Sequence, residues 1–299
     1  MILSVGEILV DMIGAEKDGG FCYERKAGGA PFNLACAVAK FGAKSGFVGA
    51  VGADTVGTFL EKFVQKQNLA YAFVEKNEKV NTTLAFVELD KNGERSFCFY
   101  RKNTADYRLP EIPEEAFQAA DTVHIGSLML SEKEGEAYAL ALANKAKAHG
   151  KIVSFDVNFR DDIFRDRAAA VTIYKQLIEL ADIVKFSEDE TEIFTKEYVE
   201  SLQDKLVCIS LGAQGSEWRY GGRANRVPSI SVKPVDTTGA GDAFYAGVLS
   251  QLDGKGRAEW TDETLNAAFR FGNVCGALNT LGRGAIDCLP NVETVKSYL

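Results

Sequence analysis

The stretch from Asp236 to Asp242 combines glycines and small polar residues, and an apolar pattern with helical spacing follows directly. The first N–H groups of a helix lack internal partners and lie at the positive end of its dipole, and glycines let an anion come close to them. A phosphate group is therefore the ligand expected for Gly239, Ala240 and Gly241. Asp242 would repel such an anion, unless its task is to accept a proton from the group that attacks the phosphate.

The same stretch also suits an ordinary helix cap, because Thr and Asp are common at helix starts. Taken alone, the residues leave capping and catalysis open. Neither standard glycine motif accounts for them. The chain contains no GxxxxGK[ST], and Gly239-Ala-Gly241 lacks the third glycine and the preceding strand of a dinucleotide fingerprint.

Polar residues near the start of the chain form a second cluster. Asp11 follows the first apolar run, and Gly28, Gly29 and Asn33 lead into a predicted helix. A carboxylate, bare backbone and an amide suit sugar hydroxyls, each of which both donates and accepts. A helix cap with a turn is the structural alternative.

A third cluster, Asp156, Asn158 and Arg160, follows the apolar run Ile152–Phe155. These groups are costly to bury without partners, which favours a functional use at the end of a central strand. The run Ser187-Glu-Asp-Glu190 could hold Mg²⁺ through water, although acidic residues are common where a helix begins.

A further glycine turn contains Ser210, Gly212 and Gly215, and by itself it is equally compatible with an ordinary hairpin.

The composition indicates a globular protein with a sizeable core. The chain has 299 residues and 46% hydrophobic content, with 34 Lys and Arg against 42 Asp and Glu, which gives a formal charge of -8. This acidic balance without a basic run argues against nucleic acid or an anionic membrane as a partner. A bound polyphosphate would therefore need Mg²⁺ or a few arginines for neutralisation.

The cysteines and the N-terminus favour a cytoplasmic protein. Six cysteines are scattered without CxxC spacing, as expected for reduced thiols that lie mostly in the core. The N-terminal run is interrupted by Glu7 and Asp11, which indicates a first strand rather than a signal peptide. No run reaches the roughly 20 apolar residues of a membrane span.

Strand and helix patterns alternate along most of the chain. The predicted strands are 2–5, 45–51, 122–125, 152–156, 183–186 and 206–210, and the predicted helices are 31–41, 54–67, 131–149, 168–180 and 261–280. This alternation predicts a parallel sheet covered by helices on both faces.

Two segments break the alternation. Residues 21–26 and 82–100, the latter with a turn at Asp90–Gly93, read as antiparallel strands. We expect them to form a small sheet over the ligand-binding ends of the parallel strands. The expected lid comprises 11–28 and 81–106, and the main α/β domain comprises 1–10, 29–80 and 107–299. A dimerisation flap is the alternative, and one sheet can serve both purposes.

These motifs resemble those of the ribokinase-like, or PfkB, carbohydrate kinases. The stretch Asp236-Thr-Thr-Gly-Ala-Gly-Asp242-Ala-Phe matches the C-terminal signature of that family, and Gly28-Gly29-Ala-Pro-Phe-Asn33 is similar to its N-terminal signature. Gly6-Glu7, the stretch 99–106 and the stretch 156–160 look most like fructokinases. The resemblance spans essentially the whole chain and implies a three-layer α/β/α domain with a mostly parallel sheet and a β-sheet lid.

The resemblance also implies roles for individual residues. Asp242 would be the general base, and the N–H groups of Gly239, Ala240 and Gly241 would form an anion hole for the transferred phosphoryl group. The implied sugar contacts are Asp11, Gly28, Gly29 and Asn33, helped by Arg101 and Arg160. The implied nucleotide contacts are Ser210, Gly212, Gly215 and Asn273.

Two ion sites are implied as well. Glu190 would reach Mg²⁺ through water, whereas Ser187 replaces the asparagine of the family pattern and is a shorter ligand. Relatives also bind a monovalent cation beside the anion hole. The matching positions here are Asp236, Thr238, Gly284 and Cys288, and the residues leave open whether K⁺ binds.

The function implied is ATP- and Mg²⁺-dependent phosphorylation of a primary sugar hydroxyl, with conversion of D-fructose to fructose 6-phosphate the first expectation. The leading alternative is 2-keto-3-deoxygluconate kinase, whose acidic sugar would use Arg101 or Arg160 as a carboxylate clamp. Another sugar kinase of the family, such as ribokinase or a nucleoside kinase, is a further alternative, and so is a sugar-binding regulator without catalysis. A homodimer that forms through the lid would be compatible with each of these functions.

Overall fold

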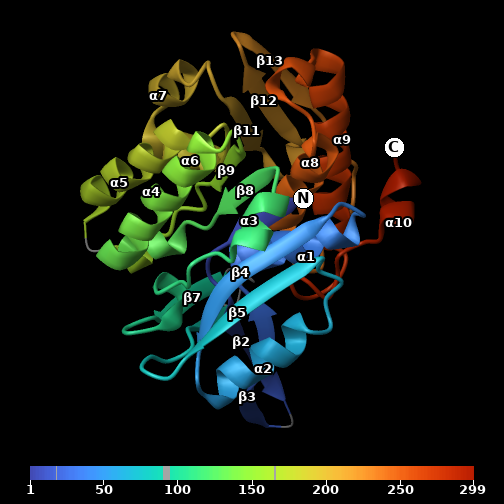
Figure 1. Cartoon of the computed structure of the whole chain (residues 1–299). Helices are drawn as coiled ribbons and strands as arrows, with labels where there is room; N and C mark the ends of the chain where they lie inside the picture. The colour runs from blue at the N-terminus through green and yellow to red at the C-terminus, as the bar shows by residue number, and fades with distance from the viewer. Residues whose placement is uncertain (18, 90–94, 165) are drawn as a thin grey trace.

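The main sheet runs through the centre of the molecule (Figure 1). The computed structural model describes residues 1–17, 19–89, 95–164 and 166–299. Nine strands lie in the order β13-β12-β11-β10-β9-β8-β1-β4-β5, and all pair in parallel except β12 and β13 at one edge. The prediction of a mostly parallel sheet is confirmed.

The strand bounds agree closely with the sequence patterns. They are β1 (Ile2–Val5), β4 (Ser45–Gly52), β5 (Tyr71–Asn77), β8 (Thr122–Ile125), β9 (Ile152–Asp156), β10 (Ile183–Ser187), β11 (Leu206–Ser210), β12 (Ser216–Tyr220) and β13 (Arg223–Val227). Three of them, β5, β12 and β13, were not predicted. β5 and β13 are edge strands with many exposed positions, so they lack the continuous apolar run of a buried parallel strand.

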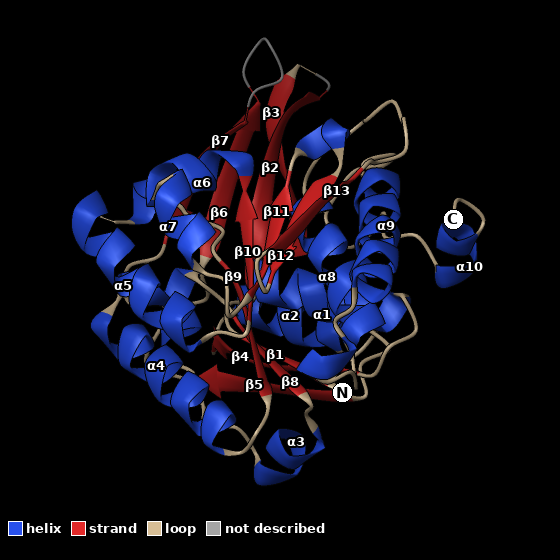
Figure 2. Ribbon diagram, turned by 90° about the horizontal axis from the view of Figure 1, so that it is seen from above, coloured by secondary structure: helices blue, strands red, loops and turns tan. Residues whose placement is uncertain are grey.

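Helices cover both faces of this sheet (Figure 2). One layer contains α3 (Glu114–Ala119), α4 (Lys133–Ala148), α5 (Arg167–Leu180), α6 (Glu188–Phe194) and α7 (Lys196–Ser201). The other contains α1 (Ala30–Lys40), α2 (Thr55–Val64), α8 (Ala240–Leu252) and α9 (Asp262–Asn279), with α10 (Val292–Lys296) close to the C-terminus. Each layer has its own apolar core against the sheet, which confirms the three-layer α/β/α architecture.

The start of α8 is fixed by its packing against α9. An ideal β-carbon on Gly247 would lie 2.8 Å from the Cα of Gly272, and one on Gly272 would lie 2.7 Å from the carbonyl oxygen of Phe244. The two helices can approach this closely only because both positions are glycine. The close approach extends to the first residue of α8, because an ideal β-carbon on Gly276 would lie 2.9 Å from the carbonyl oxygen of Ala240.

A second sheet of four strands lies apart from the first, in the order β3-β2-β6-β7. Its strands are β2 (Leu9–Lys17), β3 (Gly20–Gly28), β6 (Leu84–Leu89) and β7 (Arg95–Tyr100). The antiparallel pairing of β6 with β7 agrees with the predicted hairpin, whereas β2 was not predicted. The predicted turn at 90–93 lies outside the described residues.

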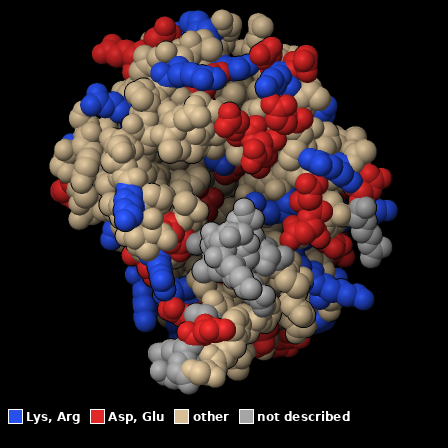
Figure 3. Space-filling view, turned by 180° about the vertical axis from the view of Figure 1, so that it is seen from behind, with Lys and Arg blue, Asp and Glu red and all other residues tan. Residues whose placement is uncertain are grey.

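The remaining general expectations have mixed outcomes. All six cysteines are free, but only Cys36, Cys208 and Cys275 are buried, so the expectation that most lie in the core is wrong. Cys22 and Cys98 are exposed on β3 and β7, the two edge strands of the second sheet. Within the described chain, no helix combines the length and apolar character that crossing a membrane requires. Acidic and basic side chains are interspersed on the face seen from behind (Figure 3).

Candidate active site

The turn before α8 has the backbone that an anion site requires. Gly239 has φ 73°, is the N-cap of α8 and makes no side-chain cap hydrogen bond. The N–H of Ala240 donates to the carbonyl of Thr237 at 3.2 Å, whereas those of Gly239 and Gly241 have no protein partner among the described residues. The capping alternative is therefore wrong for Asp242, and two free N–H groups point out of the helix start.

The carboxylate of Asp236 holds this turn in place by accepting three hydrogen bonds. Its Oδ1 accepts from the N–H of Thr238 at 2.8 Å and from the Thr238 hydroxyl at 2.7 Å, and its Oδ2 accepts from the N–H of Gly284 at 3.0 Å. Cys288 lies in the same loop and donates to the carbonyl of Arg283 at 3.0 Å. The residues predicted for a monovalent cation thus gather around one buried carboxylate.

Asp242 lies at the meeting point of the two helices α1 and α8. The amide Nδ2 of Asn33, in the first turns of α1, donates to its Oδ2 at 2.8 Å. Burial raises the pKa of Asp242, while the Asn33 hydrogen bond and the positive charges of Lys185 and Arg160 oppose that rise. Asp242 is therefore a stronger base than an ordinary carboxylate, although it lies at a helix N-terminus.

The glycines of the sugar-side cluster allow close approach of the backbone. An ideal β-carbon on Gly28 would lie 2.3 Å from Oδ2 of Asp11, and one on Gly29, where φ is 104°, would lie 2.5 Å from the carbonyl oxygen of Glu7. Asp11 pairs in register with Lys26 across β2 and β3. Asp11, Gly28 and Gly29 are thus brought together, and Asn33 follows one turn into α1.

Arg101 is part of a buried network rather than a free cation. Its Nε donates to Oδ2 of Asp106 at 2.5 Å, and its Nη1 donates to the hydroxyl of Ser131. Asp106 is 1% exposed and also accepts from the hydroxyls of Thr83 and Thr104. Asp106 ends the stretch 99–106 that resembles fructokinases, but no role was predicted for it from the sequence.

The central strands contribute a buried ion pair. Nζ of Lys185 donates to both carboxylate oxygens of Asp156, at 2.8 and 3.0 Å, and neither residue is more than 6% exposed. Burial alone would lower the pKa of Lys185, but Asp156 and the other nearby carboxylates raise it, so the amine stays charged. An ideal β-carbon on Gly241 would lie 3.6 Å from this amine, which therefore borders the anion hole.

Lys185 was not selected from the sequence, because a single lysine within an apolar strand is a weak signal. The available hint was its position directly after Asp182-Ile-Val, where a central strand begins. In the structure its positive charge and that of Arg160 both act on Asp242.

Glu190 is satisfied by backbone groups. Its Oε1 accepts from the N–H of Phe159 at 2.6 Å and its Oε2 from that of Ser187 at 2.7 Å, while Ser187 accepts from the N–H of Glu190. This capping box begins α6 and ties it to the end of β9. Among the described residues, no group of three or more His, Cys, Asp or Glu side chains could hold a metal ion.

A cavity of about 430 Å³ opens from the anion hole towards β11 and α9. Its walls include all four residues predicted to contact a nucleotide, Ser210, Gly212, Gly215 and Asn273. Thr237, Ala240 and Gly241 form the end of the cavity nearest to Asp242. Asn273 is itself positioned by donation to the carbonyl of Val227 at 2.8 Å. The cavity is partly apolar and reaches the glycine turn before α8, features that suit an adenine nucleotide.

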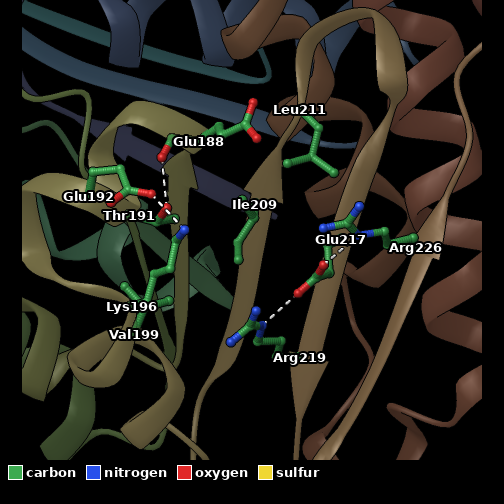
Figure 4. A pocket seen from close by; sticks show the side chains of 10 residues that line it. All are labelled: Glu188, Thr191, Glu192, Lys196, Val199, Ile209, Leu211, Glu217, Arg219 and Arg226. Atoms are coloured by element: carbon green, nitrogen blue, oxygen red, sulfur yellow. Dashed lines mark hydrogen bonds and ion pairs between the residues drawn. The ribbon is translucent and has the colours of Figure 1, made fainter.

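A smaller pocket between α6, α7 and β11–β12 lacks these features (Figure 4). Glu217 accepts from Nε of Arg219 at 2.6 Å and from Nε of Arg226 at 2.9 Å, and Lys196 pairs with Glu192 at 2.8 Å. The charges that line this pocket therefore neutralise one another. It does not compete with the larger cavity as the nucleotide site.

The model of the pfkB family carbohydrate kinases matches residues 1–292. The chain belongs to this family. Such a pfkB carbohydrate kinase transfers phosphate from ATP to a sugar. The family resemblance and the ATP-dependent sugar kinase activity expected from the sequence are both confirmed.

Known fructokinases resemble this pfkB kinase along its whole length. The fructokinase of Vibrio alginolyticus is 32% identical over 282 residues, covering 91% of each chain. The fructokinase of Xylella fastidiosa, solved with bound ATP, is 28% identical with a TM-score of 0.91, covering 99% of this chain and 97% of that one.

The fructokinase of Vibrio cholerae O395 was solved with fructose, ADP and a calcium ion. It is 32% identical with a TM-score of 0.90, covering 100% of this chain and 98% of that one. A double mutant of the same enzyme was solved with fructose, ADP and a potassium ion.

Proposed function

We propose that this pfkB kinase is a D-fructose 6-kinase that uses ATP and Mg²⁺. The observation that carries the proposal is the hydrogen bond between Asn33 and Asp242, because it joins the sugar-side cluster to the anion hole at one point. Similarity to fructokinases, including one solved with fructose and ADP, supports fructose as the acceptor.

In the proposed mechanism, Asp242 accepts the proton of a primary sugar hydroxyl as that oxygen attacks the γ-phosphorus of ATP. Its raised pKa suits this role, since a general base works best when its basicity approaches the operating pH. Asn33 orients the carboxylate, and Asp11, Gly28, Gly29 and Arg160 hold the sugar in line. Positioning of this kind is a major source of rate enhancement in phosphoryl transfer.

The transferred phosphoryl group would meet the N–H groups of Gly239 and Gly241. The N–H of Ala240 is directed to Thr237, so it contributes to the shape of the turn and would join the hole by a small rotation. Lys185 adds positive charge on the opposite side of Gly241. The departing nucleotide would lie in the cavity that Ser210, Gly212, Gly215 and Asn273 help to line.

The donor set fits a magnesium ion held mainly by phosphate oxygens and water. Each carboxyl oxygen of Glu190 already accepts one backbone N–H, so this side chain is suited to contact the ion through a water molecule. When bound, Mg²⁺ supplies charge neutralisation to the polyphosphate.

We also propose a monovalent cation site at Asp236, Thr238, Gly284 and Cys288. Asp236 is the buried carboxylate of this set, and it already draws the N–H of Gly284 to the anion-hole turn. The potassium ion in the Vibrio cholerae mutant structure supports K⁺ as the cation.

A neutral sugar fits this site better than an acidic one. The alternative substrate 2-keto-3-deoxygluconate carries a carboxylate that would require an unpaired arginine. Arg101 already has Asp106 as its counter-ion and is 8% exposed. Arg101 is therefore unsuited to clamp a carboxylate, and the similarity to fructokinases also favours fructose over a sugar acid.

The second sheet, within 11–28 and 81–106, is proposed to act as a lid and as a dimer contact. Lys26 of β3 donates to Oδ2 of Asp287 at 3.0 Å, which joins this sheet to the loop beside the anion hole. A closed lid would exclude water during transfer.

The face of this sheet opposite Asp11 carries aromatic rings: Phe21 packs on Tyr23, and Tyr23 reaches over Gly14 of β2 to Phe86. Phe86 in turn contacts Tyr100, which is 63% exposed. Such an apolar face is typical of a protein contact, and the self-complementary occupant we propose is a second copy of the same sheet. A cytosolic location is consistent with the six free thiols and the ATP requirement.

The test is a coupled assay of ADP formation with a panel of ketoses, pentoses and sugar acids, ranked by kcat/KM. The expected result is the highest value for fructose, with fructose 6-phosphate identified by ³¹P NMR. A higher kcat/KM for 2-keto-3-deoxygluconate would contradict the fructose assignment. Binding of sugar and ATP without any turnover would instead indicate a regulator.

A further inference from the structure

Glu7 is a buried acidic residue to which the mechanism above gives no task. It follows β1 at the position where the sheet order reverses, with β4 on one side of β1 and β8 on the other. In open α/β sheets the crevice at this position binds the ligand. Glu7 is 0% exposed, and among the described residues neither of its carboxyl oxygens has a hydrogen-bond partner. Burying a polar group without a hydrogen-bond partner destabilises the fold, so the presence of Glu7 here indicates a role for its carboxyl.

The Glu7 carboxyl is seated on Gly126, the residue that follows β8. An ideal β-carbon on Gly126 would lie 2.6 Å from Oε2 of Glu7 and 2.9 Å from Cγ of Pro31. Any side chain at position 126 would therefore displace the carboxyl. The main chain of Glu7 meets Gly29 of the sugar-side cluster, as described above. Glu7 thus contacts both connections that converge below the sugar.

The connection 126–131 reaches two groups of the sugar side. The hydroxyl of Ser131 accepts from Nη1 of Arg101 and donates to the carbonyl of Leu128 at 3.0 Å. Nearer to Glu7, the hydroxyl of Ser127 faces the carbonyl of Asn158 at 3.4 Å. Asn158 has φ 36°, an uncommon conformation for a residue other than glycine. A shift of this connection would therefore move Arg101 and the end of β9 together.

A further buried polar atom near Glu7, Nη2 of Arg101, lacks a partner among the described residues. Arg101 and Glu7 interact electrostatically, and so do Tyr174 and Glu7.

We propose that Glu7 is a positioning residue for the sugar: its carboxyl, seated on Gly126, fixes the connection 126–131 and thereby holds Arg101 and the end of β9 against the sugar. The proposal rests on the proposed sugar kinase function and adds a residue that does not itself touch the substrate. It assigns Glu7 to the acceptor and not to the nucleotide.

The charge state of Glu7 gives the proposal a measurable signature. Burial raises the pKa of Glu7 to about 8; the nearby main-chain N–H of Glu7 itself and the charge of Arg101 oppose this rise, and the carboxylates of Asp106 and Asp242 add to it. The groups that face it are thus Asp106 and Arg101 after β7, Asp242 on α8 and Tyr174 on α5. Near neutral pH the carboxyl is protonated, and ionisation above that pKa would place a third negative charge beside Asp106 and Asp242.

The experiment compares the wild type with Glu7→Gln and Glu7→Leu in kcat and KM, for both sugar and ATP, from about pH 6 to about pH 9. Glu217→Gln, in the pocket of Figure 4, is the control for loss of a partly buried carboxyl remote from the sugar. For the wild type we expect kcat/KM for the sugar to fall as pH rises through about 8. Glu7→Gln should keep turnover at neutral pH and lose this alkaline fall, because an amide has the same shape but does not ionise.

Glu7→Leu should raise the sugar KM roughly tenfold or more at every pH and leave the ATP KM within about twofold, because it removes both polar atoms. The proposal is overturned if Glu7→Gln retains the alkaline fall of the wild type, or if Glu7→Leu changes the ATP KM as much as the sugar KM. Should Glu7→Leu fail to fold, the isosteric Glu7→Gln carries the test.

Calorimetric titration of the sugar over the same pH range provides a readout independent of turnover. Equal sugar affinity and equal pH dependence in wild type and Glu7→Gln would reject the role of Glu7 whether or not ADP forms. A wild-type protein that binds sugar but makes no ADP with any member of the panel would instead reject the kinase assignment.

Discussion

The side-chain amide of Asn33 donates to the carboxylate of Asp242 at 2.8 Å, although the two residues are 209 positions apart in the chain. This bond joins the start of α1 to the start of α8, and so it joins the proposed acceptor side of the site to the proposed donor side. The predictions below depend on this arrangement.

Replacing Asp242 by Ala should reduce kcat by at least about 10²-fold, because the attacking hydroxyl loses its general base. The fructose KM should change much less, since binding depends mainly on Asp11 and the residues of α1. Asn33→Ala, which leaves the base in place, should have the milder effect on kcat. Steady-state kinetics of the two variants checks this, and near-full turnover by Asp242→Ala would remove Asp242 from its role.

Gly239→Ala should lower the free energy of unfolding by more than about 1 kcal/mol, because position 239 has positive φ. The added carbon would also lie 2.6 Å from Cβ of Ala285. Gly241→Ala is the matched comparison, since its nearest atom is Nζ of Lys185 at 3.6 Å and φ is not positive. Urea denaturation should show no comparable loss for Gly241→Ala, and equal losses would contradict the strain argument.

Lys185→Met should reduce both stability and turnover. The substitution leaves Asp156 as an uncompensated buried charge, which costs about 3–5 kcal/mol, and removes positive charge beside Gly241. The control is Lys205→Met, a buried lysine whose Nζ donates to the carbonyls of Glu179 at 3.0 Å and Ala181 at 3.2 Å. This variant should lose stability but keep kcat once folded; a parallel loss of kcat would show that the effect of Lys185 is only structural.

The free energy of unfolding should decrease in mild acid because His124 is buried. Burial lowers the pKa of this histidine from 6.5 to about 3, so the folded protein binds fewer protons than the unfolded chain between these values. The free energy of unfolding therefore decreases as pH falls below 6.5, by up to about 1.4 kcal/mol per pH unit from this residue.

His124→Gln removes that titration. The slope of unfolding free energy against pH should be shallower for the variant than for the wild type between about pH 6 and about pH 4. Equal slopes in urea titrations would show that other groups cause the acid sensitivity.

Tyr100→Ser should weaken the proposed dimer, because Tyr100 is the most exposed ring of the aromatic face, at 63%. Tyr298→Ser is the control, since Tyr298 is 49% exposed near the C-terminus and away from the second sheet. Light scattering on a sizing column gives the mass of each variant. A wild-type monomer at micromolar concentration would contradict the dimer itself.

Much of the fold could be predicted because its central strands are apolar runs of the length that a buried parallel sheet requires. β1, β8, β9 and β11 agree with the predicted bounds at both ends. The edge strands β5 and β13 were missed because their sequences alternate weakly and are largely exposed. β2 was missed because Gly14 and Asp11 interrupt its apolar pattern. Gly14 leaves room for the ring of Phe21, and the carboxylate of Asp11 lies against Gly28.

The residues of the candidate site also differ in how well the sequence identifies them. The candidate anion-hole turn could be selected because it matches the C-terminal signature of the family, whereas its residue types alone also suit a helix cap. Glu7 and Asp106 lie in stretches that resemble fructokinases but were assigned no role, and Lys185 has no spacing to identify it. Their roles depend on partners that are distant in the chain: Glu7 responds to Asp106 and Asp242, and Lys185 pairs with Asp156.

The division of the site between the two ends of the chain has a consequence for protein engineering. The acceptor-side residues lie between Asp11 and Arg160, whereas the residues that line the nucleotide cavity begin at Ser210. A hybrid gene could therefore exchange the first half for that of a relative with another sugar preference and retain the phosphate-handling half. Among the side-chain pairs that such a junction would have to preserve are Asn33 with Asp242, Lys26 with Asp287 and Ser154 with Tyr245, because these bonds cross the boundary between the exchanged parts.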